Sequence, residues 1–144
     1  MKNMEELKVG DQRIRYDQER TLRAYHLIER GGAEECGCNF CRNFIAQRSS
    51  AYPKSILNLL EKLGIDFRKE GEIYEIDTMD GRSHCGGWFF FAGELIEAGE
   101  YLAREENTDF EFHFADTKQL PKPSVDFGDQ VLAIDFTTTV PSIA

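Results

Sequence analysis

Two segments in the first half of the chain carry apolar residues at helical spacing. The first covers residues 40–50, where apolar side chains recur at intervals of three and four. The second begins at Pro53, a residue suited to the first position of a helix, and ends at Gly64, which readily forms a left-handed C-terminal cap. Its apolar stripe consists of Ile56, Leu59, Leu60 and Leu63. The pattern predicts two consecutive helices.

Strands are predicted before and after these helices, because apolar and polar residues alternate there. Residues 22–29 alternate in this way and are predicted to form a strand that ends at Gly31 and Gly32. Later in the chain, the run from Trp88 to Phe91 is apolar at every position, which is typical of a strand covered on both faces. The later strands are predicted over residues 72–77, 84–92, 110–115 and 131–140.

Helices early in the chain and strands late predict an α+β fold. We expect a largely antiparallel sheet with the two consecutive helices packed on it after a cysteine-rich loop. A length of 144 residues fits one domain, residues 1–144. Residues 1–20 combine charged and Gln side chains with few apolar ones and are predicted to form a loosely ordered N-terminal arm.

The chain is acidic, with 26 Asp and Glu against 17 Lys and Arg and a formal net charge of −9. This balance disfavours nucleic acids and membrane surfaces as partners, because phosphate contacts need clustered cations. The first ten residues are too polar for a secretory signal, and no apolar run is long enough to span a bilayer, so we expect a cytoplasmic protein.

Acidic residues concentrate between Glu94 and Asp116. They predict a solvated sheet edge that discourages aggregation. The alternative is a docking face for a basic protein, centred on Glu94, Glu97 and Glu100. The chain would then be a protein-interaction domain of the inhibitor or immunity type that holds no metal.

Cysteines carry the clearest chemical signal in the sequence. Cys36, Cys38 and Cys41 fall within residues 36–41, and Cys85 stands alone later in the chain. Without a secretory signal, such clustering indicates metal or redox chemistry more than a disulfide framework. Zinc prefers a tetrahedral set of thiolate and imidazole ligands, so we predict a structural zinc site formed by all four cysteines. A closed shell leaves no position for a substrate, and no nucleophile motif or phosphate loop is present, so an enzyme is not expected.

The fourth ligand depends on the strand of Cys85 ending beside the cysteine-rich loop. His84 precedes Cys85, and neighbouring strand residues point to opposite faces, so only one of the two can serve. His26 and His113 are further candidates for this position.

Two alternatives remain open for the cysteines. Cys38 and Cys41 precede a helix as a thioredoxin-type dithiol does, which indicates a thiol oxidoreductase. The other alternative is that the cysteines are reduced and partly buried and behave as small hydrophobic side chains.

The segment from Cys36 to Phe44, Cys-x-Cys-x-x-Cys-Arg-Asn-Phe, resembles a motif in a group of uncharacterised small bacterial proteins. The resemblance also covers the Gly-Gly-Trp-Phe stretch at residues 86–89. It implies a bacterial protein and no particular activity.

Overall fold

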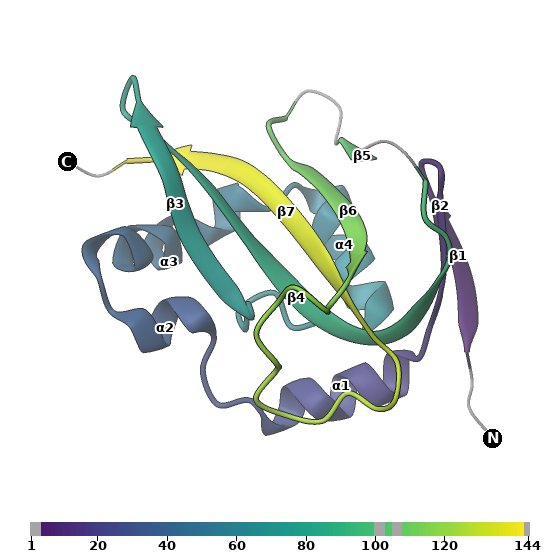
Figure 1. The fold of residues 1–144 in the computed structure, drawn as a ribbon. Helices are drawn as coiled ribbons and strands as arrows, with labels where there is room; N and C mark the ends of the chain where they lie inside the picture. The colour runs from purple at the N-terminus through teal and green to yellow at the C-terminus, as the bar shows by residue number, and fades with distance from the viewer. Residues whose placement is uncertain (1–3, 100–102, 105–107, 143–144) are drawn as a thin grey trace.

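The computed structural model describes residues 4–99, 103–104 and 108–142. Its helices are α1 (Gln18–Leu27), α2 (Gly32–Cys36), α3 (Asn39–Ala51) and α4 (Lys54–Leu63). Its strands are β1 (Glu5–Val9), β2 (Gln12–Tyr16), β3 (Glu72–Met79), β4 (Arg82–Glu97), β5 (Ala103–Arg104), β6 (Glu111–Asp116) and β7 (Val131–Pro141). The strands form one sheet, and α3 and α4 lie against one of its faces, behind the sheet in Figure 1.

The longest strand, β4, organises the sheet. Residues 82–88 of β4 pair with β3, while residues 82–92 pair with β7 on the opposite edge. The end of β4, residues 93–97, pairs with β2. Beyond β7 the sheet continues through β6 to β5. All of these pairs are antiparallel, which confirms the predicted α+β fold.

Aromatic side chains fill both faces of β4, as predicted for residues 88–91. On the face covered by α3, Phe89 stacks on Phe136 of β7, with ring centroids 5.6 Å apart. On the other face, Phe90 packs against Phe127, which belongs to the loop between β6 and β7. Burial on both faces explains why this strand has no polar alternation.

The two predicted helices are confirmed as α3 and α4. Gly64 caps α4 with a left-handed backbone (φ 87°), as its sequence position predicts. Pro53 lies one position earlier than predicted, at the N-cap.

The strand predicted over residues 22–29 is wrong, because residues 22–27 belong to α1. This helix begins after Asp17, whose carboxylate accepts a hydrogen bond from the backbone N–H of Arg20 (3.0 Å) and caps the first turn. Burial in α1 follows helical intervals of three and four instead of the strand interval of two. The buried residues are Thr21, Ala24 and Tyr25.

Residues 5–16 form a hairpin of β1 and β2 where the sequence predicts a loosely ordered arm. In β2, Ile14 and Tyr16 are buried, whereas Arg15 between them faces solvent. This alternation is too short to stand out among the charged residues around it. Pairing with β4 stabilises the hairpin.

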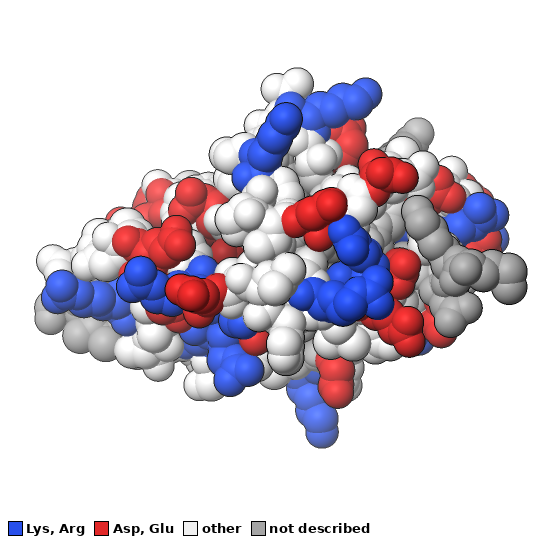
Figure 2. All heavy atoms as spheres, turned by 90° about the horizontal axis from the view of Figure 1, so that it is seen from below, with Lys and Arg blue, Asp and Glu red and all other residues white. Residues whose placement is uncertain are grey.

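The same hairpin neutralises part of the predicted acidic docking face. Arg15 lies 3.3 Å from a carboxylate oxygen of Glu94, and Arg13 lies 3.3 Å from one of Glu97. Glu100 lies outside the described residues. Acidic and basic side chains are likewise interspersed on the face of the molecule that Figure 2 shows. The intramolecular pairs reduce the charge that Glu94 and Glu97 could offer a basic protein.

A buried ion pair joins α3 to the segment before β3. The guanidinium of Arg48 donates two hydrogen bonds to the carboxylate of Glu70, each 3.0 Å long. Glu70 also accepts a hydrogen bond from the hydroxyl of Tyr52 (3.1 Å). All three side chains are buried. Burial raises the pKa of Glu70, although Arg48 and the hydrogen bonds oppose that rise.

Replacing Arg48 with Met is expected to lower the free energy of unfolding by about 3–5 kcal/mol, because Glu70 would remain buried without a cation. The double variant Arg48→Met, Glu70→Gln should recover part of this loss. Urea denaturation followed by the fluorescence of Trp88, the single tryptophan, measures both.

The exposed pair of Arg68 and Asp66 supplies the control. Arg68→Ala is expected to cost less than about 1 kcal/mol, because exposed ion pairs are weak. If Arg48→Met and Arg68→Ala lowered the free energy of unfolding by equal amounts, this result would contradict a stabilising role for the buried pair.

Candidate metal centre

Three of the four cysteines gather where α2 meets α3. Cys36 is the last residue of α2, Cys38 is the N-cap of α3, and Cys41 lies in the first turn of α3. Gly37 caps α2 with a left-handed backbone (φ 68°), which residues with a side chain adopt only with strain. This turn reverses the chain and allows the thiols on either side of it to approach one another.

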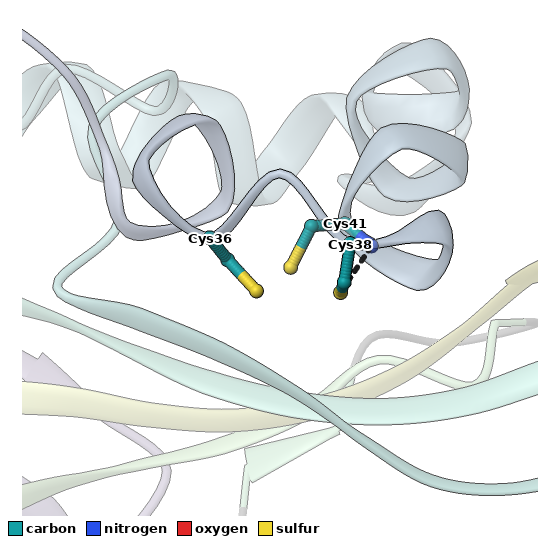
Figure 3. A group of neighbouring side chains, drawn as sticks. All are labelled: Cys36, Cys38 and Cys41. Atoms are coloured by element: carbon teal, nitrogen blue, oxygen red, sulfur yellow. Dashed lines mark hydrogen bonds between the residues drawn. The ribbon is translucent and has the colours of Figure 1, made fainter.

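The sulfur atoms of Cys36, Cys38 and Cys41, here called the cysteine trio, lie within 4.8 Å of one another. They converge on the side of the α2–α3 connection that faces the sheet (Figure 3). Sulfur ligands 2.3 Å from a tetrahedral zinc ion stand about 3.8 Å apart, so small rotations would bring these atoms onto one ion. Among the residues that the structure describes, no other group of His, Cys, Asp and Glu side chains meets this criterion. The trio can therefore hold a metal ion.

Their surroundings make the Cys38 thiol more acidic and the Cys41 thiol less acidic. The backbone N–H of Cys41 donates a hydrogen bond to the sulfur of Cys38 (3.4 Å), which lowers the pKa of the Cys38 thiol. Burial raises the pKa of the Cys41 thiol, and its hydrogen bonds with Cys38 and Cys36 add to that rise. The trio thus contains an exposed thiol that ionises readily and a buried thiol that does not.

Cys85 lies outside the trio. It is fully buried in β4, where its thiol donates to the carbonyl oxygen of Thr138 in β7 (3.7 Å). The hydroxyl of Thr138 donates to the carbonyl of Ala51 at the C-terminal end of α3, whereas the trio lies at the N-terminal end. Burial raises the pKa of Cys85 to about 12, which favours the neutral thiol. The structure does not bring Cys85 to the trio, and its service as the fourth ligand stays a prediction.

The histidines considered for the fourth position also lie outside the trio. His26 is exposed in α1, and His113 lies in β6 beside Asp135 of β7. The imidazole of His84 lies 3.9 Å from a carboxylate oxygen of Asp77, which pairs with it from β3. No His, Asp or Glu of the described segments joins the three sulfurs, so the trio offers three ligands.

Buried contacts position the segment that carries the trio. The backbone N–H of Gly32, at the start of α2, donates to the carbonyl of Glu70 (2.9 Å). A Cβ on Gly31 would lie 2.8 Å from the carbonyl oxygen of Arg68, so only glycine allows this close approach. Arg48 of α3 also binds Glu34 of α2 (3.0 Å), which joins the two helices that hold the cysteines.

Sequence reasoning missed Glu34 and Glu70. Acidic residues are plentiful in this chain, and no local pattern links either of them to Arg48. The available signal was the doublet Gly31-Gly32, which marks a close backbone approach as well as the end of an element.

No family model matches the chain, and no curated protein or solved structure is found to be similar to it. The resemblance of residues 36–44 to a motif of small bacterial proteins stays a prediction. Within the described part of the chain, no helix has the length and apolar character needed to cross a membrane. Thiols of unequal acidity that meet at one point can bind a soft metal ion or form a disulfide.

In the metal-free protein, iodoacetamide is expected to modify Cys38 first, because only thiolates react and this thiolate is stabilised and exposed. The labelling rate of Cys38 should fall as the pH is lowered, and the midpoint of this fall should lie at a pH below the ordinary thiol pKa of about 8.5. Cys41 should react at least about tenfold more slowly at neutral pH, and Cys85 only after unfolding. Peptide mapping by mass spectrometry gives the order, and faster labelling of Cys41 than of Cys38 would contradict it.

Proposed function

We propose that this chain is a small zinc-binding domain in which Cys36, Cys38 and Cys41 hold the ion. The approach of their sulfur atoms to within 4.8 Å of one another carries the proposal. Cys36 and Cys38 are exposed, so an ion can reach them from solvent. Thiolates are soft ligands that select zinc, copper(I) or iron–sulfur clusters. The spacing matches neither ferredoxin pattern, which favours zinc over a cluster.

The ion would have a structural role at the junction of α2 and α3. The helix α2 has only five residues, too few to be stable by itself. A metal bound to Cys36 at its end and to Cys38 and Cys41 of α3 would hold the two helices in one geometry. The aromatic core lies on β4 and β7, so we expect the metal-free protein to remain folded. A fourth ligand from outside the trio would complete the shell, as structural zinc sites require.

Protein purified without added metal is expected to carry about one zinc per chain, measured by elemental analysis. Cys36→Ser, Cys38→Ser and Cys41→Ser should each lose most of it, because serine offers no thiolate. Cys85→Ser is the matched control, since it removes one thiol outside the trio, and it should keep its zinc. Circular dichroism checks that each variant is folded.

A zinc-free wild-type protein whose exposed thiols titrate freely under native conditions would overturn the proposal. Loss of zinc from folded Cys85→Ser protein would show that Cys85 is the fourth ligand, and the proposal of a site with three cysteine ligands would then be wrong. Acidification should release the ion from the wild-type protein, because protons compete with the metal for each thiolate.

A second candidate function is thiol–disulfide exchange by Cys38 and Cys41. The exposed, more acidic Cys38 beside the buried Cys41 favours it. The Cys38 thiolate would attack one sulfur of a substrate disulfide and release the other as a thiolate. Cys41, after losing its proton to solvent, would then attack the Cys38 sulfur and release the remaining substrate thiolate. The chain would lose two electrons, and the substrate disulfide would gain them.

Treatment of the metal-free protein with oxidised glutathione should therefore give a Cys38–Cys41 disulfide, detected by mass spectrometry. Cys41→Ser should stop at a mixed disulfide on Cys38, because the second thiol is missing, whereas Cys36→Ser should still form the bond. Zinc-loaded protein should react more slowly, since its thiolates are engaged. Finding no disulfide, or one between Cys36 and Cys41, would exclude this function.

A further inference from the structure

The sheet face opposite α3 and α4 is the front of the sheet in Figure 1, and the loop between β6 and β7 crosses its lower part. Paired residues of neighbouring strands project to the same face. Trp88 of β4 pairs with Asp135 of β7, which in turn pairs with His113 of β6. In the next row, Tyr74 of β3 pairs with Gly86 of β4. Tyr74, Trp88, Asp135 and His113 are half-buried or exposed and are here called the outer patch.

Tyr74 and Trp88 form an aromatic surface on this patch. The ring of Tyr74 crosses β4 at Gly86, where a Cβ would lie 2.6 Å from the tyrosine hydroxyl oxygen. The ring centroids of Tyr74 and Trp88 lie 6.2 Å apart. Tyr74 is 40 % exposed although it lies on a strand beside a large aromatic residue. The ring is therefore held in place and still accessible to a ligand.

A carboxylate lies beside this aromatic surface. Asp135 offers a half-buried carboxylate. Burial raises the pKa of this carboxylate, and the neighbouring His113 partly opposes that rise. The Nδ1 atom of His113 is buried and has no hydrogen-bond partner among the described residues. A buried polar atom without a partner is rare. The carboxylate of Asp135 is the acceptor that the patch offers to a ligand.

The four residues of the patch include no Lys or Arg. Their rows are Glu72, Trp88, Asp135 and His113, and Tyr74, Gly86, Thr137, Glu111 and Arg104, so the one Lys or Arg position of the described rows lies at the far end, on β5. Lys69 and Lys122 instead line a cleft of about 220 Å³ of which Trp88 forms one wall. A cation would therefore approach the patch over Tyr74 and Asp135.

We propose that the outer patch binds an arginine side chain presented by a partner polypeptide. A guanidinium is planar, stacks on aromatic rings and carries five N–H donors. Stacked on Tyr74, it would donate to the carboxylate of Asp135. Lysine fits less well, because its ammonium group has no plane to stack. The net charge of −9 adds a general attraction for a basic partner.

The test titrates the full chain with a capped peptide that carries two arginines in a Gly-Ser sequence. Trp88 is the only tryptophan and lies in the patch, so its emission should change and saturate. Asp135→Asn should weaken the affinity about tenfold, because a charge-assisted hydrogen bond is lost. Tyr74→Leu should weaken it about threefold through the lost cation–π contact. Circular dichroism checks the fold of each variant.

Glu94→Gln is the matched control, because it removes one acidic charge from β4 at a site already paired with Arg15, and it should leave the affinity unchanged. A citrulline peptide, which keeps the shape without the charge, should not bind. A lysine peptide should bind at least about fivefold more weakly. Equal binding of the lysine peptide, equal effects of Glu94→Gln and Asp135→Asn, or no saturable change with the arginine peptide would each overturn the proposal.

Discussion

The buried ion pair of Arg48 and Glu70 connects the parts of this structure that carry its chemistry. Arg48 belongs to α3, and Glu70 precedes the edge strand β3. A third buried contact, from Tyr52, completes the set of hydrogen bonds around the carboxylate. Two charges in the interior are tolerated only because they satisfy each other, so their relative positions are tightly restricted. Arg48 also binds Glu34, and the restriction therefore extends to α2 and to the turn that follows it.

Because Arg48 attaches α2 to α3, the short turn at Gly37 between these helices has a definite geometry. Cys36 and Cys38 would belong to a mobile loop if α2 were not attached to α3 and to the segment before β3. The anchored turn leaves these two thiols in solvent and buries Cys41 in the first turn of α3. Differences in burial and hydrogen bonding then make neighbouring thiols chemically unequal. The proposed metal binding and the proposed disulfide formation would use the same sulfurs, so each would exclude the other.

The two faces of the sheet differ because α3 and α4 cover only one of them. On the covered face, Phe89 and Phe136 form part of a continuous aromatic core. On the other face, the absence of a side chain at Gly86 lets Tyr74 lie across β4 beside Trp88. The alternation of a strand thus places the aromatic core on one side of β4 and the proposed binding patch on the other.

Local sequence determined α3, α4 and the later strands, because a helical or alternating period marks most of these elements and an unbroken apolar run marks β4. It also determined the cysteine trio, whose members are close in sequence and need only one turn to meet. Residues 22–29 show the limit, since a cap from Asp17 and burial against other elements outweighed their alternation. Tertiary structure alone decided that β2 pairs with β4, that Arg48 meets Glu70, and that Cys85 lies at the other end of α3. These contacts join residues far apart in sequence, and their energies depend on burial that no local pattern contains.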